Sequence, residues 1–178
     1  MNKKTNLSPF AEKKGLINVI VETPKGSRNK YAYDESSGLL TLKKVLPCGM
    51  VFPFDFGCIP GTKGDDGDPL DVLVLMEDPV CSLCLVQAHL IGVIEAQQTE
   101  KEKKQRNDRL VAVAANGNQP AEDQTLKKVS SQTLKEIERF FVSYNELQGK
   151  KFKILKYRGP KAAVDLVKKG GRKYSKGY

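Results

Sequence analysis

The chain has 178 residues, 39% of them hydrophobic and 29% charged, which is typical of a globular protein and long enough for one domain with its own core. No apolar run approaches the roughly 20 residues of a membrane-spanning helix. The net charge of +9 suggests nucleic acid as a partner. However, residues 161–178 contain six Lys or Arg residues and one Asp, so this short segment carries more than half of the net positive charge.

The first half of the chain has the pattern of short antiparallel strands. Residues 16–22 alternate and are rich in β-branched side chains, so we expect a strand there, followed by strands at 30–33 and 39–45 in a β-meander. Residues 46–69 are expected to be mostly loop because of their prolines and glycines, and their phenylalanines are expected to line a wall (Phe52, Phe54 and Phe56).

The second half predicts further strands and two helices. Strands are expected at 71–76, 83–95 and 109–114, with the charged residues 97–108 forming a solvated excursion. Apolar residues at three- and four-residue steps predict one helix, with Thr133 and Glu136 as a capping box and Gly149 just after its end (Leu134, Ile137, Phe140, Phe141, Tyr144 and Leu147).

The end of the chain predicts one more strand and a short helix. Residues 151–157 alternate as a strand, and Pro160 is expected to open a helix that ends at Gly170. Residues 170–178 are expected to be a basic, mobile end whose deletion leaves activity unchanged. Several antiparallel strands with late helices, no βαβ alternation and no repeats predict an α+β domain, a small barrel with helices packed outside it.

The most informative stretch is residues 64–75, where four carboxylates fall within seven residues on a turn that leads into an apolar strand (Asp65, Asp66, Asp68 and Asp71). Crowded carboxylates resist joint ionisation unless a cation neutralises them, and no Lys or Arg occurs between Lys63 and Lys101. Mg²⁺ prefers such oxygen ligands and bridges them to phosphate oxygens, so we expect a Mg²⁺ site here, with Mn²⁺ as the alternative ion.

Two other interpretations compete for this stretch, a surface turn and a calcium-binding loop. An ordinary acidic surface turn is compatible with the composition alone. A calcium-binding EF-hand loop starting at Asp66 would place Glu77 at its last ligand position, but Leu70 and Asp71 then stand where a ligand oxygen and a glycine are needed.

Residues 66–72 (DGDPLDV) resemble the signature of the soluble family I inorganic pyrophosphatases, and the resemblance extends from about residue 16 to 167. It implies an OB-like five-stranded antiparallel barrel flanked by helices, and Mg²⁺-dependent hydrolysis of pyrophosphate. It also implies roles for particular residues: Asp66 and Asp71 would hold metal, Asp68 and Glu22 would be catalytic, and four residues would bind phosphate (Lys30, Lys44, Arg109 and Tyr144). The third metal-binding Asp of the family falls at Asn107 here, so we expect either that Asp108 reaches the metal through a local bulge or that Glu95, Glu100 or Glu102 takes its place.

The sequence departs from the family pattern at several positions. The family has Glu at the position of Ala32, Arg at Lys44, Tyr at both Phe52 and Phe56, and Lys at Asn145. Acidic residues of the family are replaced at three further positions (Gln98, Thr99 and Asn107). Lys44 keeps the charge but loses the bidentate fork of arginine, and the phenylalanines lose hydroxyl donors. Lys25, Arg28 and the cations of residues 101–109 are expected to compensate by folding back over the site.

The remaining expectations concern partners and compartment. Pyrophosphate and phosphate are the expected ligands, with hydrolysis of another diphosphate, or a non-enzymatic OB-like module for single-stranded nucleic acid, as alternatives. The acidic cluster and the lack of tryptophan make nucleic acid unlikely. The four cysteines fit no disulfide framework, and the lone His89 gives no support to Ser-His-Asp chemistry. The N-terminus shows no apolar core of a signal peptide. We therefore expect a cytoplasmic homo-oligomer without a membrane partner.

Overall fold

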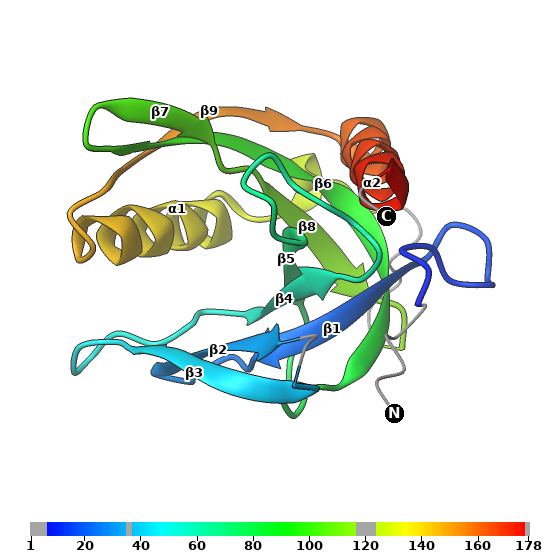
Figure 1. The fold of residues 1–178 in the computed structure, drawn as a ribbon, viewed down its shortest axis with the longest axis horizontal. Helices are drawn as coiled ribbons and strands as arrows, with labels where there is room; N and C mark the ends of the chain where they lie inside the picture. Colours follow the sequence, from blue (N-terminus) through cyan, green and yellow to red (C-terminus); the bar gives the residue numbers. More distant parts are fainter. Residues whose placement is uncertain (1–6, 35–36, 117–123, 177–178) are drawn as a thin grey trace.

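A small barrel forms the centre of the molecule (Figure 1). The structure is a computed structural model that describes residues 7–34, 37–116 and 124–176. The strands run in the order β1, β4, β5, β8 and β6, and β1 closes the ring by pairing with β6. Their bounds are β1 Ile17–Thr23, β4 Asp55–Ile59, β5 Leu70–Leu75, β6 Leu85–Glu100 and β8 Arg109–Ala114. The expected OB-like five-stranded barrel is confirmed; β5 and β8 run parallel, and the other neighbours are antiparallel.

The strand β4 lies inside a stretch that was expected to be mostly loop, so that expectation is wrong for residues 55–59. All five residues of β4 are buried between β1 and β5. Gly57 makes this possible, because a Cβ at this position would lie 2.0 Å from the backbone oxygen of Ile20. The sequence did not predict β4 because prolines precede it and because a short, fully buried strand lacks the alternation of polar and apolar residues.

The long strand β6 extends beyond the barrel. Its last residues pair with β7 (Lys103–Arg106), and its other edge pairs with β9 (Lys151–Arg158). The excursion expected at 97–108 is therefore largely a hairpin, although β7 is exposed as expected. Lys101 and Glu102 form its tip with positive φ angles of 45° and 67°, without the glycine that usually marks such a turn.

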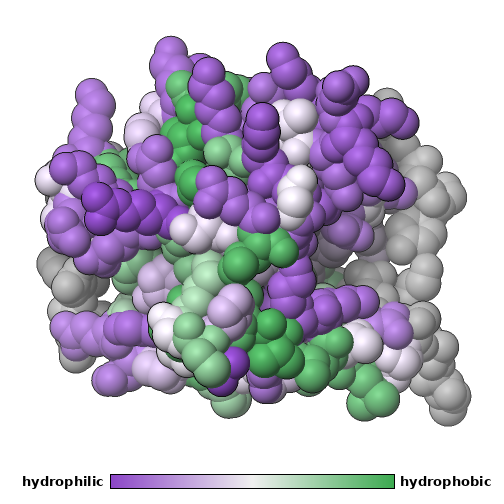
Figure 2. Space-filling model, turned by 90° about the vertical axis from the view of Figure 1, so that its left-hand side faces the viewer, coloured by the Kyte–Doolittle hydropathy of each residue, from purple (hydrophilic) through white to green (hydrophobic). Residues whose placement is uncertain are grey.

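A second, two-stranded sheet stands apart from the barrel. Strands β2 (Asn29–Asp34) and β3 (Leu39–Val45) form a hairpin at the lower side of the molecule in Figure 1. Three large apolar side chains of β3 are more than half exposed (Leu39, Leu42 and Val45). On the face shown in Figure 2, apolar side chains gather in the lower half, at the level of this hairpin, while polar ones cover most of the upper half.

Helix α1 (Ser131–Glu146) crosses the open side of the barrel, between β9 and the β2–β3 hairpin (Figure 1). It is preceded by a short 3₁₀ turn, η1 (Leu126–Lys128). Its apolar face carries an aromatic cluster, in which Phe140 lies 4.9 Å from Phe52 and 5.3 Å from Phe141 between ring centroids. The N-cap is Ser130, whose hydroxyl accepts a hydrogen bond from Thr133 N, so the predicted cap at Thr133 is three residues late.

Helix α2 (Pro160–Lys176) packs beside β6 and the loop that precedes β5 (Figure 1). The predicted helix end at Gly170 is wrong: residues 170–176, expected to be a mobile end, are helical, and Lys173 forms an ion pair with Asp65. Within the described ranges, the search for a helix long and apolar enough to cross a bilayer finds none.

Candidate active site

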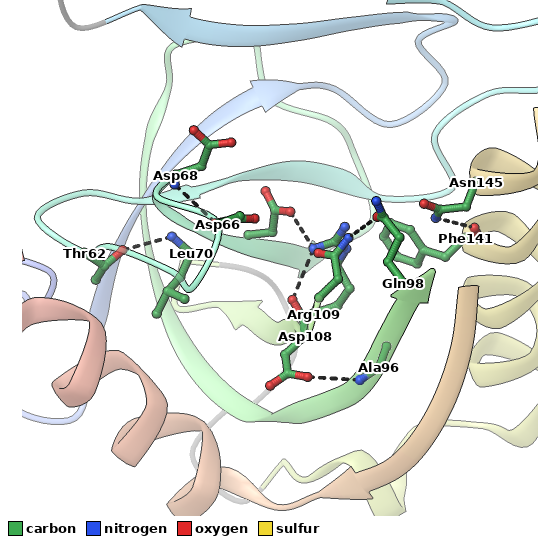
Figure 3. Close-up of polar contacts among 12 residues, drawn as sticks. Thr62, Asp66, Asp68, Leu70, Ala96, Gln98, Asp108, Arg109, Phe141 and Asn145 are labelled. Atoms are coloured by element: carbon green, nitrogen blue, oxygen red, sulfur yellow. Dashed lines mark hydrogen bonds and ion pairs between the residues drawn. The ribbon is translucent and has the colours of Figure 1, made fainter. Parts of the chain in front are cut away.

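The carboxylates of the motif lie on a tightly bonded turn between β4 and β5, residues 62–71, which we call the acid loop. Thr62 fixes both of its ends, because its hydroxyl donates to Ile59 O at 2.6 Å and accepts from Leu70 N at 3.0 Å. Inside the loop, Asp66 Oδ1 accepts from Asp68 N at 3.2 Å (Figure 3). These bonds hold Asp66 and Asp68 in the turn just before β5, and Asp71 follows as the second residue of that strand.

Electrostatic strain remains in this loop. Desolvation raises the pKa of Asp66, and the neighbouring Asp68 and Asp71 raise it further, although a hydrogen bond from the Asp68 backbone opposes the change. A bound cation would relieve this repulsion, because it neutralises the carboxylates without protonating them.

Glu22 projects from β1 into a pocket of about 230 Å³ that Lys30, Asp68 and Asp71 also line. Its carboxylate accepts a hydrogen bond from Tyr33 N at 2.8 Å and is 7% exposed. Burial raises the pKa of Glu22 to about 7, against the effect of the backbone hydrogen bond. A carboxyl group in this state exchanges protons near neutral pH.

Cations from the β2–β3 hairpin face the aromatic cluster. Lys30 and Lys44 are cross-strand partners, and their Nζ atoms lie 5.6 and 5.4 Å from the ring centroid of Tyr144. Desolvation lowers the pKa of Lys44, and the nearby charge of Lys30 lowers it further. Crowded cations and crowded carboxylates therefore both occur around the site, an arrangement suited to a polyanion held with a metal ion.

Lys43 is a pocket residue that the sequence pattern did not indicate. Lys30 pairs with Lys44 but Tyr31 pairs with Leu42, so Lys43 is the extra residue of an irregularity in β3. Such irregularities redirect side chains, and Lys43 lines the same pocket as Glu22 and Lys30. Strict alternation would have put Lys43 and Lys44 on opposite faces.

Arg109 opens β8 with its guanidinium buried against the acid loop. Its Nη1 lies 2.5 Å from Asp71 Oδ2 and 3.2 Å from Asp108 O, and the group lies 5.1 Å from the Phe141 ring centroid. Its Nε is the one buried side-chain polar atom without a hydrogen-bond partner among the described residues. Arg109 therefore neutralises one oxygen of Asp71 and retains a donor that is not used within the protein.

Asp108 lies in the same pocket lining as Asp66 and Asp71, but its carboxylate has other partners. It accepts from Ala96 N at 3.0 Å and pairs with Arg106 at 2.9 Å. Figure 3 shows the side chain directed toward the backbone of β6 and away from Asp66 and Asp68. A metal-binding role for Asp108 would require it to share or exchange these partners.

Several departures from the family pattern fit their surroundings. Asn107 donates to Gln98 Oε1 at 2.6 Å, a neutral pair where acidic residues were expected. Asn145 is buried and donates to Phe141 O at 2.7 Å, and Phe52 is 1% exposed in the aromatic cluster. Thr99 pairs with β7 and β9. Ala32 pairs with Thr41, whose hydroxyl donates to Ala32 O at 3.4 Å, and it lines the pocket of Glu22 and Lys30.

Two of the expected compensating cations face other partners. Lys25 donates to Glu77 O at 2.9 Å, and the guanidinium of Arg28 donates to Leu46 O at 3.2 and 2.9 Å. In the 101–109 segment, Arg106 binds Asp108 and Glu95. The expectation that Lys25 and Arg28 fold over the site is therefore wrong for this structure.

The residues of the acid loop fit a divalent cation better than those of β6 and β8 do. The described residues contain no group of three or more carboxylate, imidazole or thiolate side chains already gathered around one point. Asp66 and Asp68, however, are hard oxygen donors, and burial together with the neighbouring carboxylates raises the pKa of Asp66, which a bound cation would oppose. Gln98 and Asn107 instead bind each other.

An OB-like barrel that places a carboxylate loop opposite crowded lysines defines a protein of the metal- and polyanion-binding class. The inorganic pyrophosphatase family model matches residues 19–175, and the chain belongs to this family. It is 34% identical to the inorganic pyrophosphatase of Synechocystis over 166 residues, 93% of this chain and 96% of that protein. The relative from Methanosarcina acetivorans is 35% identical over 88% of this chain and 90% of its own length.

Solved structures agree with the sequence comparisons. The crystal structure of inorganic pyrophosphatase from Thermus thermophilus superposes with a TM-score of 0.86 at 30% identity, covering 98% of this chain and 99% of that one. The enzyme from Neisseria gonorrhoeae gives a TM-score of 0.85 at 29% identity, covering 97% and 98%. The resemblance inferred from residues 66–72 is therefore confirmed over nearly the whole chain.

Proposed function

We propose that this chain hydrolyses pyrophosphate to two phosphate ions with the help of bound Mg²⁺, or of Mn²⁺ in its place. The observation that carries the proposal is the single pocket in which Glu22, Asp68 and Asp71 face Lys30 and Lys43. Carboxylates alone would repel a polyanion and lysines alone would repel a metal ion. Together they suit a metal–pyrophosphate complex, whose charges they neutralise from both sides.

The residues divide into three roles. Asp66 and Asp71 would hold the metal ion, which lowers the pKa of a bound water when present. Asp68, exposed at the rim of the pocket, takes the proton from the attacking water. Lys30, Lys44, Arg109 and the Tyr144 hydroxyl bind phosphate oxygens and stabilise the charge that develops on the leaving phosphate.

Glu22 has a separate role in proton exchange. Because its pKa is raised to about 7, the carboxyl group is protonated in part of the molecules at neutral pH. Its hydrogen bond from Tyr33 N ties β1 to the β2–β3 hairpin, which carries Lys30 and Lys44. Glu22 therefore couples a proton near the pocket to the position of the phosphate-binding lysines.

The altered phosphate contacts support a second candidate, hydrolysis of another diphosphate. Lys44, Phe52, Phe56 and Asn145 all differ from the family residues at substrate positions, and Phe52, Phe56 and Asn145 are buried without a free donor directed at the pocket among the described contacts. A substrate with one esterified phosphate needs fewer such donors than pyrophosphate does.

Phosphate release from pyrophosphate, with and without Mg²⁺, tests the proposal. We expect release only with the metal, and faster release from pyrophosphate than from nucleoside or sugar diphosphates. A faster reaction with one of the organic diphosphates would establish the second candidate. No phosphate from any diphosphate, together with a gel shift of single-stranded oligonucleotide, would instead favour a nucleic-acid-binding module.

We also propose that the chain is a cytoplasmic homo-oligomer. Among the described cysteines, Cys48 and Cys81 are exposed free thiols, which is typical of a reducing compartment. The exposed apolar side chains of β3 support association with further copies. Sedimentation at several protein concentrations tests the assembly.

A further inference from the structure

The C-terminal half of α2 rests directly on the acid loop. The backbone N–H of Lys63 donates to Gly170 O at 3.1 Å, although this oxygen lies within a helix. Three residues further along, Lys173 forms an ion pair with Asp65. Contacts from one helix therefore reach two consecutive parts of the loop that carries Asp66 and Asp68.

Gly170 lets the helix come this close. Glycine inside a helix costs about 1 kcal/mol relative to alanine, so its presence in the middle of α2 calls for a packing reason. A Cβ at Gly170 would lie 2.8 Å from Leu70 Cδ1, the end of a flexible side chain that would have to move, and 3.2 Å from Thr62 Cβ, which would have to shift by a few tenths of an ångström. Thr62 and Leu70 are the residues whose mutual hydrogen bond closes the acid loop.

The neighbouring Gly171 has no such restriction. A Cβ there would meet Gly61 O and Pro9 Cγ at 3.8 Å, which is an ordinary van der Waals distance. The two adjacent glycines therefore differ in one respect that matters for the site: only Gly170 faces the residues that close the acid loop.

The ion pair between Lys173 and Asp65 is a second, weaker contact between α2 and the acid loop. The hydrogen bond from Lys173 is the largest cause that lowers the pKa of Asp65. Both side chains are partly exposed, so the pair contributes modestly, as surface pairs usually do. It nevertheless gives α2 a second contact with the acid loop, at Asp65.

We propose that Gly170 and Lys173 are positioning residues, through which α2 sets the conformation of the acid loop for metal binding. This inference rests on the proposed metal-dependent hydrolysis. Displacing Thr62 or Leu70 would shift the start of β5, and with it Asp71, relative to Asp66. Small displacements of this kind strongly affect rates and affinities, because metal ligands must converge on one point. The expectation that residues 170–178 can be deleted without effect is replaced by this proposal.

Gly170→Ala and Gly171→Ala form a matched pair for the test, because both changes raise helix propensity equally. We expect Gly171→Ala to bind Mn²⁺ and to hydrolyse pyrophosphate as the wild type does. Gly170→Ala should weaken Mn²⁺ binding in calorimetry and lower turnover, each by about tenfold. Hydrogen exchange of the amides in residues 62–70 should be faster in Gly170→Ala alone.

A second change distinguishes local displacement from general destabilisation. Leu70→Val removes the Cδ1 atom that a Cβ at Gly170 would strike, so it should restore part of the Mn²⁺ affinity lost in Gly170→Ala. Lys173→Ala should weaken Mn²⁺ binding by less than about threefold, as expected for an exposed ion pair, and Lys168→Ala, an exposed lysine on the same helix, should not change it.

Equal Mn²⁺ affinity and equal amide exchange in the two alanine variants would overturn the proposal. So would a loss in Gly170→Ala that Leu70→Val does not reduce, if both proteins melt at the wild-type temperature. Failure of the wild type itself to hydrolyse pyrophosphate would contradict the proposed function, while the exchange and Mn²⁺ measurements would still decide the role of α2.

Discussion

The two sides of the candidate active site treat their charges differently. On the acid loop, Asp66 and Asp68 form no ion pair among the described residues, and burial raises the pKa of Asp66. On the side formed by β6 and β8, Asp108 is bound to Arg106 and to a backbone amide, and Asn107 binds Gln98. The side chains near β6 and β8 therefore bind one another, whereas Asp66 and Asp68 keep carboxylate oxygens for a ligand. The comparison indicates that metal binding depends mainly on the acid loop.

Asp68→Asn should have the largest effect on this comparison. Amide replaces carboxylate with little change in size, so the fold and most of the metal affinity should remain. If Asp68 takes the proton from the attacking water, turnover should fall by about 10²–10⁴-fold, the usual contribution of a general base. Steady-state phosphate release and Mn²⁺ calorimetry on the same protein check both expectations. Wild-type turnover would remove Asp68 from the mechanism.

The second prediction concerns the effect of pH on protein stability through Glu22, which lies on β1 in the same pocket as Asp68 and Asp71, and it is tested without metal. The pKa of Glu22 is raised from 4.5 to about 7 in the folded protein, so the folded state holds a proton that the unfolded state releases. This stabilisation is complete below pH 4.5 and is lost as the pH rises through 7. The free energy of unfolding should therefore fall by roughly 2–3 kcal/mol across that range because of this group.

Glu22→Gln supplies the control for this prediction. Its amide oxygen can still accept the hydrogen bond from Tyr33 N, but it does not titrate. Urea unfolding of both proteins between pH 4.5 and 7.5, in the presence of a chelator, should show a decline in the wild type that is absent from the variant. Parallel pH profiles for the two proteins would show that Glu22 has an ordinary pKa.

The third prediction compares the two sides directly. Asp66→Asn removes a charge from the crowded loop, whereas Asp108→Asn removes one that Arg106 and Ala96 N already satisfy. We expect about a tenfold loss of Mn²⁺ affinity from the first change, a value in the lower range for altered metal-site groups. The second should mainly lower the melting temperature. A larger loss of affinity in Asp108→Asn would show that Asp108 turns toward the metal.

The site was predictable from the sequence where the chemistry is local. Glu22, Lys30, Asp68 and Asp71 line one pocket, whereas Asp66 lines a second pocket that shares Asp71; the roles that the resemblance implies for them stay predictions. Contacts that depend on packing between distant elements were not predictable. Gly170 was interpreted as a helix end because glycine commonly ends helices, but its neighbours Thr62 and Leu70 are about a hundred residues away in the chain.

The fold shows the same limit. The alternating strand β9 was predicted to within one residue of its observed bounds, since its alternation is visible in the sequence. The buried strand β4 shows no alternation, and the β6–β7 hairpin turns at Lys101 and Glu102 without glycine. Lys43 was missed because an irregularity in β3, which alternation does not reveal, brings it to the pocket.

The smallest expected effect comes from restoring family residues on the phosphate-binding wall, with Lys44→Arg and Phe56→Tyr. Lys44 already lies 5.4 Å above the Tyr144 ring, and Lys43 adds a cation that lines the pocket. Phe56 is 2% exposed, so a hydroxyl there must find a partner within the core. We therefore expect turnover and the Michaelis constant for pyrophosphate to change by less than about threefold, because Lys44 already carries the charge and the buried Phe56 does not line the pocket.

A large gain would change the interpretation of the whole wall. If both substitutions together raised turnover by tenfold or more, the present residues would be poor pyrophosphate contacts, and hydrolysis of another diphosphate would become the better assignment. The Lys43→Ala variant separates the two cases. When Lys43 compensates for the altered neighbours, its loss should raise the Michaelis constant for pyrophosphate more in the wild-type background than in the Lys44→Arg background. If Lys43→Ala raised the Michaelis constant equally in both backgrounds, Lys43 and Lys44 would act independently. Lys43 would then not compensate for the altered phosphate-binding residues.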